Sequence, residues 1–150
     1  MKQRIVSFDF DRTLSRPDIQ EYAAELMQRG YEVHVVTARY NELQKHAWVA
    51  SPHNDDLWEI IDQLGIPHRF VHFTNMLLKA EVIFKNAPQV LFHLDDCPVE
   101  TKEINDLTKV TGIILCNSGA WKQKCEEVLS AFENPPAPKK TKKQLNQTLK

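Results

Sequence analysis

Glycine and cysteine are scarce in this chain, and each shortage excludes a class of site. With four glycines among 150 residues, the sequence holds neither the Gly-rich dinucleotide fingerprint nor a phosphate loop ending in Gly-Lys-Ser/Thr. Its three cysteines, Cys97, Cys116 and Cys125, have no paired metal-ligand spacing, so we expect free thiols in a reducing compartment. Nicotinamide cofactors, ATP held by a phosphate loop and a cysteine zinc site are therefore not expected.

Long apolar runs are absent as well. The apolar run near the start is too short for a signal peptide and is broken by Asp9, and no stretch approaches the length of a membrane span. We therefore expect a soluble, cytoplasmic protein with no membrane partner.

Charge divides the chain into two parts. Residues 135–150, "PPAPKKTKKQLNQTLK", carry five lysines and no acid, whereas residues 1–134 hold 14 basic and 20 acidic residues. The terminal stretch has too few large apolar side chains to offset the entropy lost on ordering. The sequence thus predicts one domain over 1–134 and a flexible basic tail over 135–150. That tail is either simply solvated or an electrostatic contact for nucleic acid.

Short apolar runs alternate with amphipathic segments in the domain, which is typical of an α/β fold with a mostly parallel sheet. The first helix is expected to begin with Ser15 as its cap, and the second to be capped by Asn54 or Asp55. Residues 39–54 are the least regular stretch and predict a loop over the site or a short helix with a turn. Strands are expected before Asp9 and at 32–37, 69–74, 89–94 and 112–116, and helices at 15–30, 54–65, 77–86, 99–108 and 120–132.

Two acids, Asp9 and Asp11, follow the first apolar run with one residue between them. In an extended segment, residues two apart point the same way, so these carboxylates converge if the strand geometry continues to its tip. Two close carboxylates repel unless a cation or a shared proton lies between them. The stretch therefore predicts either a bound metal ion or a proton shared between the two carboxylates.

Two further predicted strands end in polar residues. Thr37, with Arg39 just after it, ends the second strand, and Asp95 and Asp96 end the fourth. Ligands of parallel α/β sheets gather beyond the carboxyl ends of the strands. Each group alone also fits turn or cap chemistry, but their joint occurrence at one sheet edge favours a site. Oxygen ligands of this kind suit a hard dication such as Mg²⁺ beside a substrate phosphate.

These runs resemble the motifs of the haloacid dehalogenase-like (HAD) superfamily. "IVSFDFDRTL" resembles its first motif, "VHVVTAR" its second and "VLFHLDD" its fourth. The third motif is a lysine, for which we choose Lys79, with Lys85 in reserve. The resemblance covers about residues 4–117 and implies a Rossmannoid three-layer fold, with a mostly parallel five-stranded sheet and helices on both faces.

The resemblance also implies roles for the acids. Asp9 would be the nucleophile that forms an aspartyl phosphate, and Asp11 the general acid and base. Mg²⁺ would be held by the side chains of Asp9 and Asp95 and by the backbone carbonyl of Asp11, while Asp96 would orient that shell or join it. The implied activity is magnesium-dependent hydrolysis of phosphomonoesters.

Other residues would bind the phosphorylated substrate or shape the loop. Thr37, Arg39 and Lys79 would bind the phosphoryl group. Thr13 would maintain the loop geometry, and Arg12 departs from the family pattern because many relatives have glycine there.

The sequence leaves no room for a large cap domain, because only 23 residues separate Thr13 from Thr37. An open site suits a bulky substrate, such as a nucleic acid 3′ end or a sugar phosphate, unless a partner subunit closes it. "TAR" with the loop after it, the helix at 54–65 and "LDD" resemble the phosphatase domain of phage polynucleotide kinases, and they also resemble capless relatives encoded near polysaccharide genes.

Two alternatives stay open. A catalytically silent module on the same fold would bind or sense phosphate without cleaving it. A receiver-like signalling domain also clusters acids with a Thr and a Lys. Such domains usually place the paired acids after the first strand and the phosphate-accepting aspartate after the third, whereas here that order is reversed. Of the histidines, His46 and His53 fall near the expected site entrance, whereas His93 reads as a satisfied histidine within a strand.

Overall fold

Five parallel strands form one sheet in a computed structural model that describes residues 3–41, 54–116 and 119–136. The sheet order is β3-β2-β1-β4-β5. β1 is therefore central, and the carboxyl ends of β2 and β4 lie on either side of its own. The strands are β1 (Ile5–Phe8), β2 (Glu32–Thr37), β3 (Val71–Phe73), β4 (Val90–Asp95) and β5 (Thr111–Ile114).

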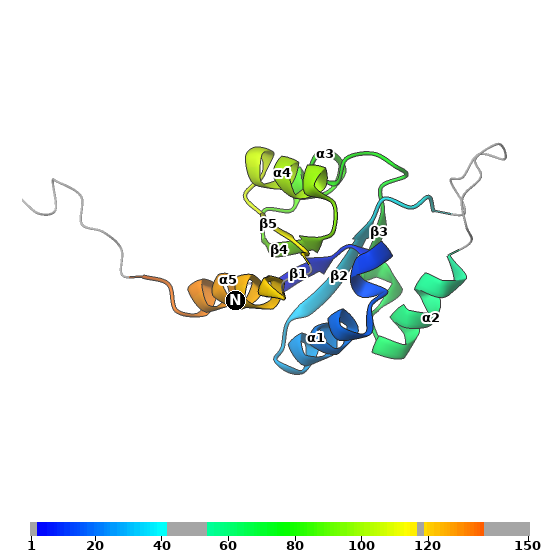
Figure 1. The fold of residues 1–150 in the computed structure, drawn as a ribbon, viewed down its shortest axis with the longest axis horizontal. Helices are drawn as coiled ribbons and strands as arrows, with labels where there is room; N and C mark the ends of the chain where they lie inside the picture. The colour runs from blue at the N-terminus through cyan, green and yellow to red at the C-terminus, as the bar shows by residue number, and fades with distance from the viewer. Residues whose placement is uncertain (1–2, 42–53, 117–118, 137–150) are drawn as a thin grey trace, which may run out of the picture.

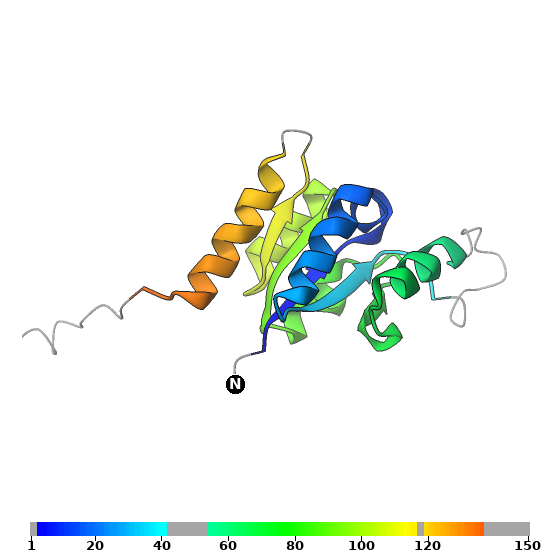
Figure 2. The same ribbon diagram turned by 90° about the horizontal axis from the view of Figure 1, so that it is seen from below.

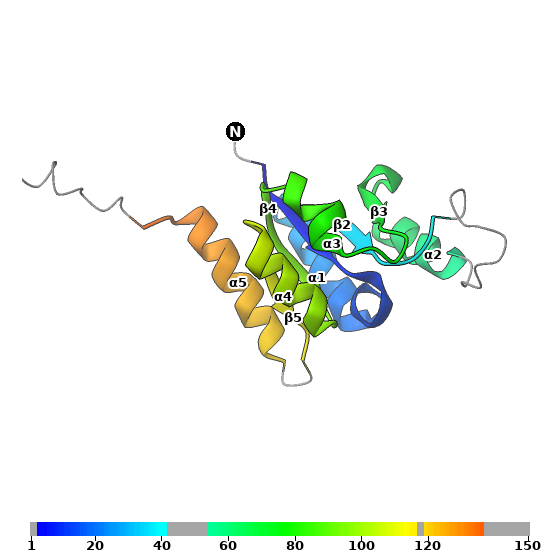
Figure 3. The same cartoon turned by 90° about the horizontal axis from the view of Figure 1, so that it is seen from above.

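Helices cover both faces of the sheet, which confirms the predicted three-layer α/β architecture. α1, α2 and α5 lie on one face (Figure 2), and α3 and α4 on the other (Figure 3). The described residues contain no inserted cap domain (Figure 1). The helices are α1 (Pro17–Gln28), α2 (Asp55–Leu64), α3 (Lys79–Val82), α4 (Pro98–Leu107) and α5 (Ala120–Glu133).

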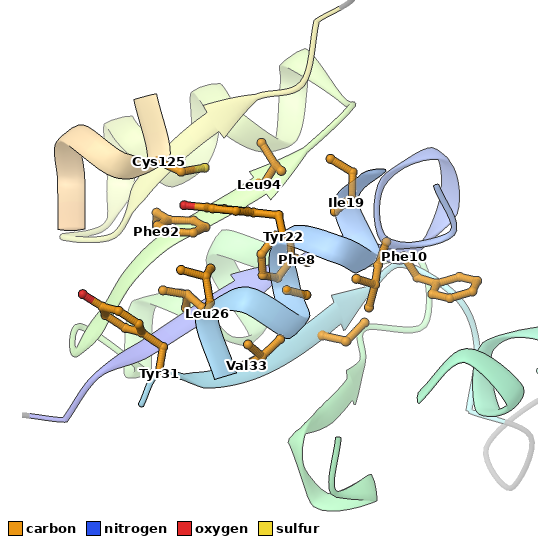
Figure 4. Close-up of a cluster of buried hydrophobic side chains, with 14 of the residues drawn as sticks. Phe8, Phe10, Ile19, Tyr22, Leu26, Tyr31, Val33, Phe92, Leu94 and Cys125 are labelled. Carbon is orange, nitrogen blue, oxygen red and sulfur yellow. The ribbon is translucent and has the colours of Figure 1, made fainter. Parts of the chain in front are cut away.

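The larger apolar core lies between the sheet and α1, α2 and α5. Figure 4 shows Tyr22 of α1 and Cys125 of α5 against Phe8 and Phe92 of the two central strands. The ring of Phe8 meets those of Tyr22 and Phe92 edge-on, with centroids 6.4 and 5.8 Å apart. Burial of these rings holds β1 and β4 in place, so the polar residues at their ends have a rigid base.

Element boundaries differ from the sequence-based expectation in several places. α1 begins at Pro17 with Arg16, not Ser15, at its cap position and without a side-chain cap hydrogen bond, and the Ser15 hydroxyl accepts the backbone N–H of Arg12 at 3.0 Å. Asn54 is at the cap position of α2 as expected, but its side chain makes no cap hydrogen bond to that helix. β3 is shorter than predicted because a 3₁₀ turn takes up His68–Phe70. α3 has four residues, and a second 3₁₀ turn follows it.

Some predicted features lie outside the described residues. These are the central part of the irregular stretch, residues 42–53, with His46 and His53, and most of the basic tail, residues 137–150. No helix in the described ranges combines the length and apolar character needed to span a membrane.

Candidate active site

The loop after β1 carries the first acid into the centre of the sheet edge. Asp9 donates its backbone N–H to the carbonyl of Leu94 at 2.9 Å, which continues the β1–β4 pairing by one residue. The chain then turns through Phe10–Leu14, with Arg12 at a left-handed φ of 59°. A non-glycine residue pays roughly 1–2 kcal/mol for that conformation, and Arg12 is the position at which the sequence departs from the motif that it resembles. Thr13 Oγ1 donates to Asp9 Oδ2 at 3.4 Å, which agrees with the loop role expected for Thr13.

A buried lysine joins two of the predicted acids. Lys79 Nζ lies 2.8 Å from Asp9 Oδ1 and 2.6 Å from Asp95 Oδ2. The side chains of Lys79, Asp9 and Asp95 are 2%, 8% and 1% exposed, respectively. The reserve candidate, Lys85, instead forms an exposed pair with Glu81. The tertiary structure thus selects Lys79 as the lysine of this edge.

The electrostatics of the three groups are unequal. Burial, with the nearby charge of Asp95, raises the pKa of Asp9 to about 8, although Lys79 acts in the opposite direction. Burial would also raise the pKa of Asp95, but the hydrogen bond from His93 and the charge of Lys79 outweigh it and hold that pKa well below its usual range. One ammonium therefore balances one carboxylate, and ionising Asp9 leaves a buried negative charge uncompensated.

Three acids at this edge suit a metal ion. Asp9, Asp95 and Asp96 each offer one carboxylate oxygen, and these oxygens lie within 4.8 Å of one another. A hard dication would supply the positive charge that the site lacks when Asp9 is ionised, and carboxylate oxygens are the ligands it prefers. The residues present therefore fit the Mg²⁺ expected from the sequence.

Below this group lies a buried polar chain whose function the sequence did not indicate. Ser7 Oγ lies 2.9 Å from His93 Nδ1, and His93 Nε2 lies 2.8 Å from Asp95 Oδ2. Ser7 and His93 face each other in the β1–β4 register. Each stands two residues before an acid of the site, so strand alternation places it on the same side of the sheet as that acid. The spacing of two residues before each acid was the sequence feature that could have indicated this chain. Both ring nitrogens of His93 have hydrogen-bond partners, as was expected for this histidine.

Asp11 lies apart from the acid cluster and is held by Arg39. Its carboxylate accepts Arg39 Nε at 2.9 Å and Nη2 at 2.7 Å, and it is 55% exposed. The same guanidinium donates to Asp56 at 2.8 and 2.9 Å and lies over the ring of Phe10, 4.9 Å from its centroid. The Arg39 guanidinium thus bridges two carboxylates and makes two hydrogen bonds with each of them. Its predicted contact with substrate stays a prediction, as does the expected Mg²⁺ contact of the Asp11 carbonyl.

Thr37 is placed where the sequence expected it. It is fully buried as the last residue of β2, the strand next to β1. Its hydroxyl accepts the backbone N–H of Arg39 at 3.2 Å. A buried hydroxyl can also donate one hydrogen bond, so Thr37 keeps the capacity to bind an anion at the strand ends.

The tertiary structure brings Asp9, Lys79, Asp95 and Asp96 together, and places Thr37 and the Arg39–Asp11 pair at the same sheet edge. In comparisons with known proteins, no family model and no curated protein matches the chain. What the chain can do chemically is therefore argued from this group of side chains: a lysine between two buried acids, a third acid beside them, and a half-exposed acid held at the rim.

Proposed function

We propose that this protein is a magnesium-dependent phosphomonoester hydrolase of the HAD-like type, with Asp9 as its nucleophile. The observation that carries the proposal is Lys79, buried between Asp9 and Asp95 with Asp96 alongside. A structural ion pair needs one acid for its lysine, whereas Lys79 contacts two acids and a third, Asp96, lies beside them. Such an excess of buried acid is unfavourable for folding, and it becomes useful where a metal and a phosphoryl group bind.

Asp9 is arranged for attack on phosphorus. Its two oxygens are oriented by Lys79 and Thr13, so little reorganisation is needed when substrate arrives. In the first step a carboxylate oxygen of Asp9 forms a bond to phosphorus, the bond from phosphorus to the leaving oxygen breaks, and that oxygen takes a proton from Asp11. Water then attacks phosphorus, Asp11 takes its proton, and cleavage of the bond to Asp9 releases inorganic phosphate.

The remaining groups stabilise charge during these steps. Mg²⁺, when bound, offsets the negative charge of the acids and of the phosphoryl oxygens. Lys79 and the hydroxyl of Thr37 supply fixed positive charge and a hydrogen-bond donor at the same strand ends. Because the described residues contain no cap over the sheet edge, we propose a bulky substrate, such as a nucleic acid 3′ end or a sugar phosphate.

Asp11 would act as general acid and base from the exposed side of the site. Arg39 donates to both of its oxygens, so one of these hydrogen bonds must open and Asp11 must take up a proton from solvent before it can transfer that proton to a leaving group. Arg39 therefore positions Asp11 and, through Asp56, ties it to the start of α2. The same contacts support the second candidate function, a module that binds phosphate while its acid stays locked.

The test is release of inorganic phosphate from an aryl phosphate, nucleotides, DNA with a 3′-phosphate, sugar phosphates and phosphopeptides, with Mg²⁺ or with EDTA. We expect Mg²⁺-dependent release that falls by about a thousandfold or more in Asp9→Asn and by about a hundredfold or more in Asp11→Asn. Asp62→Asn, at an exposed acid on α2 that pairs with His68, is the matched control and should keep full activity.

Two results would contradict the proposal. Unchanged turnover in Asp9→Asn would exclude the covalent mechanism. No release from any of these substrates, with Mg²⁺ binding intact by calorimetry, would favour the phosphate-binding module.

A further inference from the structure

The buried chain from Ser7 through His93 to Asp95 ends on a carboxylate of the proposed metal site. Ser7 and His93 have no exposed surface, and Asp95 is 1% exposed. The ring of His93 also packs against Phe84, with centroids 4.9 Å apart. A histidine is an unusual choice for a fully buried strand position, because both ring nitrogens must find partners. Here both do, and one of those partners is a site residue.

The direction of each hydrogen bond follows from the chemistry of the end groups. An ionised carboxylate only accepts hydrogen bonds, so His93 Nε2 must carry the proton that it shares with Asp95 Oδ2. In a neutral ring Nδ1 is then an acceptor, and the hydroxyl of Ser7 donates to it. Ser7 thus selects the tautomer of His93 that donates to Asp95.

The contacts of Asp95 distinguish its two oxygens. Oδ2 accepts hydrogen bonds from Lys79 at 2.6 Å and from His93 at 2.8 Å. Oδ1 accepts one, from the backbone N–H of Cys97 at 3.0 Å. A carboxylate oxygen has two lone-pair sites, so Oδ2 is saturated by protein donors while Oδ1 keeps one site. The arrangement also prevents the carboxylate from rotating.

We infer that His93, oriented by Ser7, is a positioning residue that holds Asp95 so that Oδ1 faces a divalent cation. The inference rests on the proposed function for the cation and deepens it by assigning a role to two residues for which the family resemblance implied none. Partners that orient metal-binding side chains typically change metal affinity by about 10- to 100-fold when they are removed. Substrate need not be present for this effect.

The test is Mg²⁺ affinity of the full chain, measured by titration calorimetry without substrate. We expect His93→Leu, which removes the donor, to weaken Mg²⁺ binding about 10- to 100-fold. His93→Gln, whose side-chain amide can still donate to Oδ2, should stay within about threefold of the wild type, and Ser7→Ala should fall between the two. His34→Gln is the matched control, because His34 is a partly buried histidine in the neighbouring strand β2 that contacts His72 and no site acid; the Mg²⁺ affinity of this variant should not change.

A second measurement covers the case in which His93→Leu fails to fold. Long-range ¹H–¹⁵N spectra of the wild-type protein should show His93 as the neutral tautomer protonated on Nε2, and Ser7→Ala should lose that single tautomer. Protonation on Nδ1 in the wild type, or wild-type Mg²⁺ affinity in a folded His93→Leu variant, would overturn the inference. Either result leaves the proposed hydrolase standing, whereas Mg²⁺ binding with the expected variant series but no phosphate release would refute only the hydrolase. Absence of Mg²⁺ binding in the wild type would overturn both.

Discussion

Asp9 is subject to two opposing demands. Burial disfavours its charged form, yet the proposed nucleophilic attack requires that form. Lys79 relieves part of this conflict, but Asp95 lies against the same ammonium, so one positive charge serves two acids. Arg39 has the same ratio of charges in a more exposed place, with one guanidinium between the two half-exposed acids Asp11 and Asp56. Each of these cations thus pairs with two acids and leaves one negative charge unbalanced. At Lys79, a bound Mg²⁺ would supply the missing positive charge.

A pH effect is expected from His34, away from the site. His34 stacks on Phe70 with centroids 4.3 Å apart, and its Nδ1 lies 3.0 Å from Nε2 of His72. Burial, with the nearby His72 and Arg69, lowers the pKa of His34 from 6.5 to about 4. A histidine with a depressed folded-state pKa contributes stability that is present above its unfolded pKa and is lost as pH falls toward the folded value. The free energy of unfolding should therefore drop between pH 6.5 and 4.

The variant His34→Phe removes this titration while keeping an aromatic ring on Phe70. We expect the loss of stability between pH 7 and 4 to be smaller in the variant by up to about 3 kcal/mol, measured by urea unfolding at several pH values. His68→Gln, at a largely exposed histidine, is the control and should keep the wild-type profile. Parallel profiles for wild type and His34→Phe would show that His34 is not the group responsible.

At the scale of elements, the candidate site depends on the shortest α-helix among the described residues. α3 has four residues and begins with Lys79, whose backbone N–H is accepted by Glu100 of α4 at 3.0 Å. The loop before it passes through left-handed conformations at Asn75 and Met76, and Met76 bonds back to the carbonyl of Ala38 at 2.7 Å. An isolated helix of this length is unstable in water. Packing against α4 and the end of β2 therefore holds the lysine in place.

The contact between α4 and β5 offers a test of how tightly these elements pack. A Cβ added at Gly112 of β5 would lie 2.7 Å from the carbonyl oxygen of Thr101 on α4. Asn105 of α4 also bonds both the N–H and the carbonyl of Gly112, at 2.8 and 3.0 Å. We expect Gly112→Ala to lower the free energy of unfolding by about 1–3 kcal/mol, because backbone rather than a flexible side chain must move.

Urea unfolding measures this change. Thr111→Ala, at the exposed neighbouring position of the same strand, should cost no more than about 0.5 kcal/mol. Equal stability of Gly112→Ala and the wild type would mean that α4 shifts away from β5 without cost.

At the scale of the whole molecule, the candidate site and the basic tail belong to parts of the chain with opposite charge. The site lies at the carboxyl ends of β1, β2 and β4, and the described chain leaves the sheet through α5, which ends at Glu133. The predicted boundary between domain and tail falls at the next residue and stays a prediction. The five lysines beyond it give the protein a basic segment attached to an acidic domain.

We expect the tail to affect binding of polyanions without affecting the chemistry. Deleting residues 137–150 should leave phosphate release from an aryl phosphate unchanged and weaken binding to DNA that carries a 3′-phosphate. The slope of log affinity against log salt concentration should fall by about 0.7 to 0.9 for each DNA phosphate that a tail lysine no longer neutralises. Fluorescence anisotropy at several salt concentrations measures this slope. A variant with the five lysines changed to glutamine keeps the length of the tail and should behave like the deletion; identical DNA affinity in all three proteins would exclude a nucleic-acid role for the tail.

Local sequence patterns predicted the α/β fold with its parallel sheet and the acids at the strand ends, while the family resemblance added the three layers. The bounds of β2 were predicted correctly, and those of α2, α4 and α5 to within a residue or so, because alternation and helical periodicity are properties of neighbouring residues. Acids at strand ends were recognisable because parallel strands present their carboxyl ends at one edge. The short α3 and β3 were overestimated, since their apolar runs also serve 3₁₀ turns.

Other features depend on contacts between residues far apart in the chain. Lys79 and Asp9 are 70 residues apart, and Ser7 and His93 are 86 apart. No local pattern distinguishes Lys79 from Lys85, or shows that Arg39 holds Asp11. The sequence by itself determined which elements form and where acids follow strands, because those are set by neighbouring side chains. Only the tertiary structure decided which lysine, histidine and arginine meet those acids, because that depends on how the strands are ordered and how their ends pack.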